Sequence, residues 1–345
     1  MKPDNIIKLA DPILVTGSNG FIGTRVVENL LARGFTNLRL FVRPSGKLGK
    51  LKTILDKYPA GKNCEIVTGD LLSREDCKTA ARDVSIIIHL AAGFEKSFAG
   101  AFMNSALATR NLIEAFLELG QPRRFVNVSS FAVYSNLKME RHALLDETCP
   151  LEDAPQERHD AYGFGKLQQE KIVRDYAKKQ NLSFVILRPG AVYGPGKPDL
   201  SGRVGINTFG FFIHLGGSNE LPLTFVDNCA EAIVLAALTP GVDGETFNVV
   251  DDETMTSRDF LAARKSAEPF FSVWIPYPLA YLGSVLWENY SKKSGGQLPP
   301  VFNRRRCAAE WQGNHYTNQK LHDRLGWKQK VPLADAMKLF LAQYQ

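Results

Sequence analysis

The chain has 345 residues, of which 44% are hydrophobic, and 42 lysines and arginines against 36 acidic residues give a formal net charge of +6. This length and composition predict one large or two smaller folded domains with a substantial core. The basic residues form only short clusters without zinc-ligand spacing, so we expect neither a nucleic-acid partner nor a metal site. No apolar run reaches the roughly 20 residues that a membrane-spanning helix requires.

The five cysteines are odd in number and widely spaced, and no two form a C-x-x-C pair. This usage favours reduced thiols and predicts a cytoplasmic location. Residues 1–5 lack the apolar stretch of a signal peptide, so none is expected.

An apolar run over residues 13–16 predicts a buried strand, and Gly17, Gly20 and Gly23 follow it at three-residue spacing. Residues 24–31 then show helical periodicity. In such a turn, glycine permits positive φ and close approach to a pyrophosphate, while the helix N-terminus offers unpaired N–H groups. The pattern predicts a dinucleotide-binding turn; the alternative is an ordinary glycine-rich turn.

Residues 37–42 predict a second strand, which is followed by Arg43. Many dinucleotide folds carry an acidic residue there that binds the ribose hydroxyls, and none is present. Arg43 could bind a 2′-phosphate, with Ser45 or Lys47 as an additional donor, which predicts NADP as the cofactor. The alternative is that Arg43 is a loop residue and the cofactor is NAD.

Residues 65–71 predict a third strand that leads to Asp70. This carboxylate could accept a hydrogen bond from an adenine amino group, or it could cap the helix that begins near Ser73. Residues 84–93 give the clearest pattern of a buried parallel strand. Within it, His89 is expected to be a hydrogen-bonded core residue rather than a catalyst.

A predicted helix over 102–119 and a strand over 124–130 continue the alternation of strand and helix. This alternation predicts an α/β fold, a doubly wound parallel sheet of the Rossmann type. We expect a dinucleotide-binding domain over 1–194 and a smaller, mainly substrate-binding α/β portion over 195–345. Segments around 225–250 are expected to pack back on the first domain.

Tyr162 and Lys166 are four residues apart, on one face of a predicted helix. An ammonium group about 4 Å from a phenol, together with an oxidised nicotinamide, would favour the phenolate; the ammonium charge alone is enough for a pKa shift of roughly three units at an effective dielectric constant of about 20. Ser130 ends the preceding strand, where it could bind the same substrate oxygen. Alone, the pair is typical of an exposed helix surface, but behind a dinucleotide turn it indicates a proton-transfer site.

Several motifs occur in order across nearly the whole chain: Thr16-Gly17-x-x-Gly20-Phe21-Ile22-Gly23, Asp70-Leu71, His89-Leu90-Ala91-Ala92, Ser129-Ser130, Tyr162-x-x-x-Lys166 and Leu187-Arg188-Pro189-Gly190-Ala191-Val192-Tyr193-Gly194-Pro195-Gly196. Together they resemble the extended short-chain dehydrogenase/reductase superfamily. The resemblance implies a Rossmann domain and a catalytic set of Ser130, Tyr162 and Lys166.

The resemblance also implies which residues bind the cofactor. The glycine turn would hold the pyrophosphate, Asp70 and Leu71 the adenine, and residues 189–192 the nicotinamide. The full expected set, which includes Tyr162 and Lys166, is Gly17, Asn19, Gly20, Phe21, Ile22, Gly23, Arg43, Asp70, Leu71, Leu90, Ala91, Ala92, Pro189, Gly190, Ala191 and Val192.

Several subgroups of the superfamily compete. Val42-Arg43-Pro44 resembles dihydroflavonol reductases, and residues 275–283 with Leu325-Gly326-Trp327 resemble 3β-hydroxysteroid dehydrogenase-like proteins. Ser130-x-Ala132-Val133-Tyr134 is similar to sugar-nucleotide epimerases. The 4,6-dehydratases are disfavoured, because Phe131-Ala132 replaces their Asp-Glu pair.

One departure from the superfamily pattern lies in the helix over 102–119. That helix usually carries an asparagine before Gly-Thr, whereas this chain has Asn104-Ser105-Ala106-Leu107-Ala108-Thr109. The asparagine is either displaced by one residue, to Asn104, or replaced by Ser105.

The C-terminal half is less regular. Asp227 is expected to cap a helix, although a functional role is the alternative. The aromatic and apolar segment 270–287 could cover an apolar substrate, lie in a membrane interface beside Lys292 and Lys293, or pack as core. Alternatively, Arg203 and the arginines at 304–306 could bind a charged ligand such as a sugar nucleotide. These three are Arg304, Arg305 and Arg306.

These observations favour a nicotinamide-dependent oxidoreductase that interconverts a secondary alcohol and a ketone on a sizeable, partly apolar small molecule. The first alternative is a nucleotide-sugar epimerase that uses the same residues without net cofactor turnover. An alternative from another class is a dinucleotide-sensing protein without catalysis. We expect a homodimer with no membrane-spanning segment, and peripheral membrane contact is left open.

Overall fold

The computed structural model describes residues 5–93, 96–198, 201–208, 210–295 and 297–344. Most of the N-terminal stretch on which the expectation of no signal peptide rests therefore lies outside the described residues. Among the described helices, none is both long enough and apolar enough to cross a lipid bilayer.

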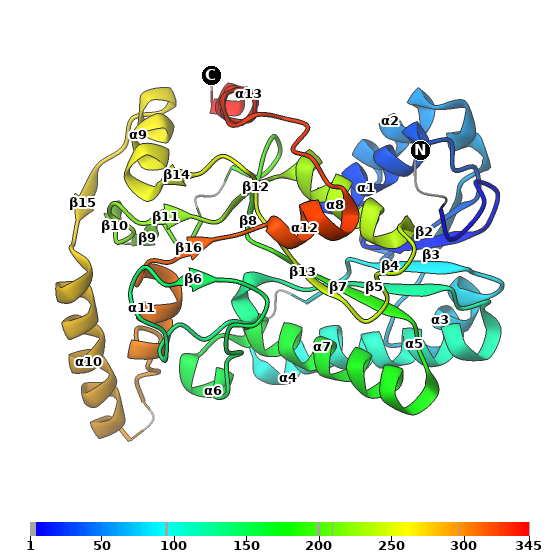
Figure 1. The fold of residues 1–345 in the computed structure, drawn as a ribbon. Coiled ribbons are helices and arrows are strands. Elements are labelled where there is room, and N and C mark those ends of the chain that lie inside the picture. Colours follow the sequence, from blue (N-terminus) through cyan, green and yellow to red (C-terminus); the bar gives the residue numbers. More distant parts are fainter. Residues whose placement is uncertain (1–4, 94–95, 199–200, 209, 296, 345) are drawn as a thin grey trace.

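Seven parallel strands form the central sheet, in the order β13–β7–β5–β4–β1–β2–β3 (Figure 1). The chain builds outward from β1 to β3 and then crosses to β4 on the other side of β1. This reversal is the point where open α/β sheets bind ligands, outside the carboxyl ends of the strands. The strands are β1 (Ile13–Thr16), β2 (Leu38–Val42), β3 (Glu65–Thr68), β4 (Ile86–His89), β5 (Arg124–Val128), β7 (Phe184–Pro189) and β13 (Thr246–Val249).

Successive side chains of the central strands enter two separate cores. In β1, Ile13 and Val15 belong to one apolar cluster and Leu14 to the other. Ile88 and Ile87 of β4 divide in the same way. A strand buried on both faces has to be apolar at every position, and this accounts for the unbroken apolar runs in the sequence.

Helices cover both faces of the sheet, as Figure 1 shows. The first core lies under α1, α2 and α8, and the second lies under α3, α5 and α7. The doubly wound Rossmann fold predicted from the sequence is confirmed. The six helices are α1 (Phe21–Ala32), α2 (Gly49–Lys57), α8 (Val226–Leu238), α3 (Arg74–Ala81), α5 (Ala108–Leu119) and α7 (Ala161–Gln180).

The expected helix over 102–119 is helical throughout, but it contains a wider turn. It begins as α4 (Phe98–Ala101), continues as the π-helical segment η2 (Phe102–Leu107) and ends as α5. A π-helical segment shifts the phase of the side chains that follow, and such segments are frequent at functional sites.

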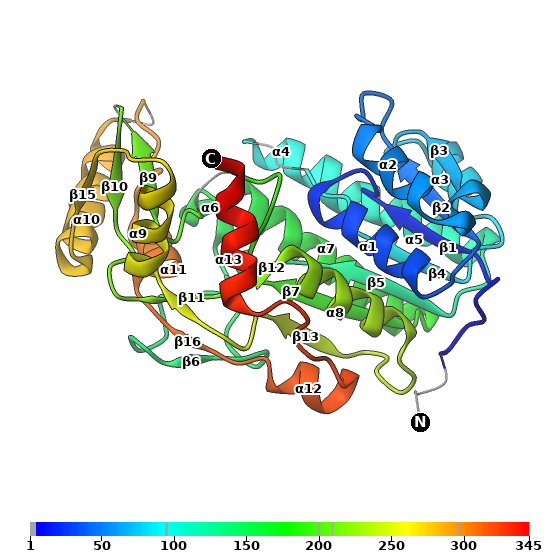
Figure 2. The ribbon, with the colours of Figure 1, turned by 90° about the horizontal axis from the view of Figure 1, so that it is seen from above.

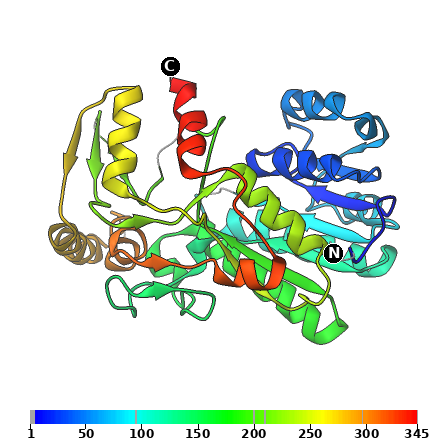
Figure 3. The same cartoon turned by 45° about the horizontal axis from the view of Figure 1, so that its top comes forward.

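The region beyond the central sheet consists of short strands and peripheral helices, most of them from residues 195–345 but some from earlier in the chain (Figure 3). Its largest sheet has three strands, β15–β10–β9, and further short pairs are β12–β8, β11–β14 and β16–β6. These strands are β6 (Leu144–Leu145), β8 (Ala191–Tyr193), β9 (Gly205–Thr208), β10 (Phe211–His214), β11 (Glu220–Leu221), β12 (Leu223–Phe225), β14 (Met255–Thr256), β15 (Ser272–Trp274) and β16 (His315–Tyr316).

The remaining helices lie mostly around this portion. They are α6 (Pro155–Arg158), α9 (Ser257–Ala267), α10 (Tyr277–Lys293), α11 (Arg304–Trp311), α12 (Gln319–Leu325) and α13 (Leu333–Leu341). Single 3₁₀ turns are η1 (Pro59–Asn63), η3 (Phe131–Val133) and η4 (Ala342–Tyr344).

Two late elements complete the central sheet and one of its cores. Strand β13 pairs with β7 at the edge, and α8 lies beside α1 (Figure 2). The prediction that Asp227 caps α8 is wrong, because the helix begins at Val226 and Asp227 lies within its first turn. There its carboxylate pairs with Arg25 of α1, at 3.2 Å.

Helix α10 is exposed over most of its length. Tyr277, Tyr281 and Ala280 pack into a small apolar cluster, whereas Leu282 and Leu286 are 54% and 62% exposed. The outer face of α10 is thus both apolar and accessible, at the far edge of the molecule from the central sheet (Figure 1).

Candidate active site

The glycine turn after β1 has the close packing that its sequence predicts. Gly17 has a φ of +66°, which L side chains rarely adopt. A Cβ on Gly23 would lie 2.0 Å from the carbonyl oxygen of Gly17, so only glycine fits. Helix α1 follows from Gly20, which has no side chain to occupy the N–H groups of the first turn. This geometry fits a bound pyrophosphate.

A cavity of about 530 Å³ lies at the carboxyl edge of the sheet, beside this turn. Its walls come from the residues that follow β1, β2, β3, β4, β5 and β7. All the residues predicted to bind the cofactor or to act in catalysis line this cleft: Gly17, Asn19, Gly20, Phe21, Ile22, Gly23, Arg43, Asp70, Leu71, Leu90, Ala91, Ala92, Ser130, Tyr162, Lys166, Pro189, Gly190, Ala191 and Val192.

The wall beyond β2 carries an arginine where an acidic residue is common. Arg43 is exposed, and its carbonyl accepts a hydrogen bond from Gly46 at 2.8 Å, which closes a tight turn. Ser45 also lines the cleft, whereas Lys47 is not among its walls. Arg43 and Ser45 are therefore the side chains of this turn that can meet a ligand.

Asp70 lies in the cleft wall rather than at a helix cap. Ser73 caps α3, accepting a hydrogen bond from the backbone N–H of Asp76 at 3.2 Å. The carboxylate of Asp70 accepts from the N–H of Leu72 at 3.0 Å. The capping alternative for Asp70 is therefore wrong.

Ser130, Tyr162 and Lys166 come together at the end of β5. Helix α7 begins at Ala161 behind an Asp160 cap, and the first turn carries Tyr162 to Ser130, with which it hydrogen-bonds. One turn later, the Nζ atom of Lys166 donates to the carbonyl of Val128 at 2.7 Å. The same Nζ atom lies 5.9 Å from the centre of the Tyr162 ring.

Burial dominates the protonation of this pair. It raises the pKa of Tyr162 to about 12, a rise that the hydrogen bond from Ser130 opposes and the charge of Asp160 reinforces. It lowers the pKa of Lys166 to about 7, against the opposing effect of Glu170. Without a cofactor, the phenol therefore keeps its proton at neutral pH, and the amine is only partly charged. That Lys166 and an oxidised nicotinamide together lower the pKa of Tyr162 stays a prediction.

Helix α7 is fixed to the sheet directly behind the site. Glu170 forms two hydrogen bonds with Arg188 of β7, at 2.9 and 2.7 Å, and both side chains are buried. Arg188 also donates to the Tyr134 hydroxyl at 2.9 Å, and that hydroxyl donates to Asn248 of β13 at 2.6 Å. This paired network holds α7 in one position, so Lys166, one turn before Glu170, is held as well.

His89 is a core residue, as predicted. Its Nδ1 atom lies 2.8 Å from the Thr16 hydroxyl and its Nε2 atom 2.9 Å from the Thr109 hydroxyl, and the ring is 1% exposed. Burial and the nearby Lys166 charge lower its pKa to about 3. The neutral ring thereby links β1, β4 and α5 beneath the cleft.

The π-helical segment resolves the position of the expected asparagine. Asn104 lines the cleft, whereas Ser105 is buried and accepts a hydrogen bond from the N–H of Gly93 at 3.2 Å. The wider turn thus shifts the cleft-facing position by one residue. Asn104 and Lys197 were not among the predicted site residues; Lys197 also lines the cleft and donates to Val192 at 3.1 Å.

A second cavity, of about 660 Å³, lies on the other side of Ser130 and Tyr162. The two cavities share these side chains and the backbone of Gly190 and Ala191. The second cavity extends toward α6, the loop before β9, and α11. Among the described residues, its walls include none from α10, so that helix does not cover it.

Comparison with known proteins identifies the fold and family. The NAD-dependent epimerase/dehydratase family model matches residues 13–249. The mouse sterol-4-alpha-carboxylate 3-dehydrogenase, decarboxylating, is 26% identical over 97% of this chain and 91% of its own length. An Escherichia coli O157:H7 N-acetyl-alpha-D-glucosaminyl-diphospho-ditrans,octacis-undecaprenol 4-epimerase is 24% identical over 83% and 81%.

The fold also matches solved structures. UDP-glucuronic acid 4-epimerase from Bacillus cereus, crystallised with UDP-glucuronic acid and NAD, superposes with a TM-score of 0.71 at 21% identity and covers 96% of this chain and 98% of that one. The family match, the parallel sheet and the glycine turn agree. The chain belongs to the NAD-dependent epimerase/dehydratase family, within the extended short-chain dehydrogenase/reductase superfamily, and is an enzyme.

Proposed function

We propose that this enzyme is an NAD(P)-dependent oxidoreductase that interconverts a secondary alcohol and a ketone on a sizeable, partly apolar substrate. The observation that carries the proposal is the shared wall: Ser130 and Tyr162 face both the cofactor cleft and the second cavity. A substrate oxygen at this wall can meet two hydroxyl groups next to the cofactor. The mouse relative, a sterol-4-alpha-carboxylate 3-dehydrogenase, decarboxylating, supports a substrate of this size and polarity.

In the proposed mechanism, Tyr162 exchanges a proton with the substrate oxygen, and Ser130 holds that oxygen by a second hydrogen bond. A phenol with a pKa near 12 keeps its proton at neutral pH, which suits it to protonate a ketone oxygen during reduction. A nicotinamide held by residues 189–192 would supply or accept the hydride. Lys166, whose Nζ atom lies 5.9 Å from the centre of the Tyr162 ring, is proposed to lower the phenol pKa in the cofactor-bound enzyme and to hold the nicotinamide ribose.

Asn104 joins this set as a positioning residue, because it lines the same cleft from the π-helical segment. Residues 17–23, 43, 70–71, 90–92 and 189–192 are proposed to hold the cofactor. The remaining walls of the second cavity are proposed to bind the substrate, so that residues 195–345 mainly serve substrate binding.

The test is Tyr162→Phe, which removes the proton but keeps the ring. We expect kcat to fall by about 10²- to 10⁴-fold while cofactor affinity changes little. Tyr176→Phe, on the same helix but bonded to Glu114 at 2.7 Å, is the matched control and should retain activity. An unchanged kcat in Tyr162→Phe would refute the proposed role.

The second candidate function is epimerisation of a nucleotide sugar, favoured by the 4-epimerase among the relatives. It would use the same residues but return the hydride to the same molecule. Candidate substrates incubated with stoichiometric cofactor separate the two functions. A lasting change in the absorbance of the reduced nicotinamide supports the oxidoreductase, whereas a stereoisomer formed without that change supports the epimerase.

For the cofactor, we propose NADP, with NAD as the alternative. The exposed guanidinium of Arg43 at the cleft and the absence of an acid in the segment from Phe41 to Gly46 support binding of a 2′-phosphate. The NAD in related crystal structures supports the alternative. Comparing the Kd of NADPH with that of NADH decides between them.

We also propose that the outer face of α10 touches lipid. Leu279, Leu282, Leu286 and Tyr290 are each more than half exposed, and Lys293 ends the helix beside them. An apolar face bordered by basic residues is typical of helices that lie in the interface of an anionic membrane. The homodimer and the cytoplasmic location stay predictions; light scattering and cell fractionation test them.

A further inference from the structure

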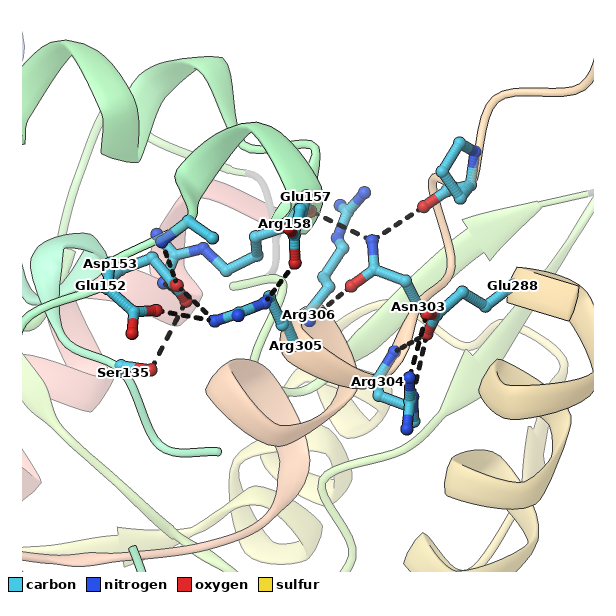
Figure 4. Close-up of polar contacts among 12 residues, drawn as sticks. Ser135, Glu152, Asp153, Glu157, Arg158, Glu288, Asn303, Arg304, Arg305 and Arg306 are labelled. Atoms are coloured by element: carbon cyan, nitrogen blue, oxygen red, sulfur yellow. Dashed lines mark hydrogen bonds and ion pairs between the residues drawn. The ribbon is translucent and has the colours of Figure 1, made fainter. Parts of the chain in front are cut away.

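Helix α11 begins with three consecutive arginines, and two of them pair with carboxylates of neighbouring segments (Figure 4). Arg304 forms two parallel hydrogen bonds with Glu288 of α10, at 3.0 and 3.1 Å. Arg305 turns toward a different group of carboxylates and lies 2.8 Å from Glu152 and 2.9 Å from Asp153. These two guanidinium groups therefore serve to fix α11 to its neighbours.

Arg306 has a different environment. It lines the second cavity, as does Arg203 from the loop before β9. Each donates to a backbone carbonyl, Arg306 to Val301 at 3.1 Å and Arg203 to Ala309 at 3.0 Å. The same nitrogen of Arg203 also lies 3.5 Å from the Tyr316 hydroxyl. Within the described ranges, no carboxylate lies at salt-bridge distance from either one, so most of their five N–H donors remain available to a ligand.

The other charged groups of this cavity leave an excess of positive charge. Arg158 and Asp160 pair with each other at 2.7 Å. Lys96 adds a third cation to the wall, and Glu310 is the remaining carboxylate among the described residues that line it. A partly desolvated pocket with this balance attracts anions and disfavours cations.

We propose that the second cavity binds an oxyanion substituent of the substrate, a carboxylate or a phosphoryl group, through Arg203 and Arg306. The inference rests on the proposed function, because the same cavity must present the reacting oxygen to Ser130 and Tyr162. Apolar side chains such as Phe131 and Val301 line the rest of the wall. The substrate is thus an amphipathic acid: an apolar body, an alcohol or ketone at the shared wall, and an oxyanion held by the two guanidinium groups.

Equilibrium binding tests this without turnover. The enzyme is first saturated with oxidised cofactor, so that a phosphate probe cannot enter the glycine turn. Calorimetry then compares two matched pairs of probes: a 3-oxosteroid carboxylic acid with its methyl ester, and UDP with uridine. We expect the acid or UDP to bind at least about tenfold more tightly than its neutral partner, and the pair that shows the preference distinguishes a carboxylate from a phosphoryl ligand.

Arg306→Gln and Arg203→Gln should each lower the affinity ratio between the charged probe and its neutral partner by about tenfold. The affinity for the neutral partner should stay nearly unchanged. Arg304→Gln, with the same loss of charge on the same helix turn, is the control and should retain the preference. Equal affinity for charged and neutral probes in the wild-type enzyme, or a preference that survives both substitutions, would overturn the proposal. Loss of turnover in Tyr162→Phe concerns the proposed function alone, because these binding measurements do not require it.

Discussion

The two cavities that meet at Ser130 and Tyr162 are built in different ways. The cofactor cleft takes its walls from the ends of parallel strands, whose buried ladders determine where each backbone segment stops. The second cavity takes much of its wall from α11 and irregular segments, which are held by side-chain contacts such as those of Arg305. Backbone pairing thus positions the residues proposed to bind the cofactor, whereas ion pairs and single hydrogen bonds position those proposed to bind the substrate.

This contrast predicts different responses to substitution. Changes that disturb the backbone should be most damaging in the cofactor cleft, where one segment packs directly on another. Changes of charge should matter most in the C-terminal portion. There, the proposed substrate contacts depend on which arginines are already paired with a carboxylate.

The largest effect is expected from Gly23→Ala. Its Cβ would overlap the Gly17 carbonyl at 2.0 Å, so the turn must shift away from the position that fits a pyrophosphate. We expect both NADPH and NADH to bind at least about a hundredfold more weakly. Gly49→Ala is the control, because nothing lies within 4 Å of the added Cβ. If Gly23→Ala bound cofactor normally, the role of this close contact would be refuted.

A smaller and selective effect is expected from Arg43→Ala. Removal of the guanidinium deletes a charge-assisted contact to a 2′-phosphate and touches no backbone packing. We expect the Kd of NADPH to rise by roughly tenfold to a hundredfold and the Kd of NADH to change little. Equal losses for the two cofactors in fluorescence titrations would contradict the preference for NADP.

In the C-terminal portion, Leu286→Glu tests the exposed face of α10. The substitution removes apolar surface and adds a negative charge, so we expect sedimentation with phosphatidylglycerol vesicles to weaken by about tenfold. Leu339→Glu on α13 is the control, since that leucine is 47% exposed and lies on another helix. Equal vesicle binding by the wild type and Leu286→Glu would exclude lipid contact at this face.

The smallest effect concerns the buried His89. Its folded-state pKa is lowered to about 3 from an ordinary value of 6.5. As the pH falls below 6.5, the unfolded chain takes up a proton that the folded protein does not, so stability decreases over this window. Between about pH 7 and about pH 5.5, the wild type should lose about 1 kcal/mol more than His89→Gln in urea unfolding. Identical losses would show that the ring is not held neutral.

Local sequence patterns were sufficient to predict most of the residues that line the first cavity. Glycine spacing requires only neighbouring residues, and β4 is apolar at every position before His89 because both faces of the strand are buried. Apart from Tyr162 and Lys166 of α7, the predicted cleft residues lie at or after the ends of strands, and parallel strands all end at the same edge. For the expected asparagine, the sequence left two alternatives, Asn104 and Ser105, and could not decide between them, because a π-helical segment changes the periodicity of the helix.

Properties that depend on distant partners could not be predicted. The partners of Arg304 and Arg305 lie 16 and 153 residues away, and nothing in three identical neighbours indicates which one is left for a ligand. The protonation of Tyr162 and Lys166 likewise depends on burial by other elements, which the spacing of the two residues does not reveal. Asp227 resembled a cap, but the helix starts one residue earlier.

The late arrival of β13 has a consequence for synthesis of the protein. This edge strand ends at Val249, and α8, which completes the core over α1, precedes it closely. A nascent chain that has emerged only as far as Gly194 therefore lacks one strand of the sheet and leaves part of the α1 surface uncovered. Since chains fold as they leave the ribosome, the nucleotide-binding half must wait for much of its neighbour before it can close, and the two halves mature together.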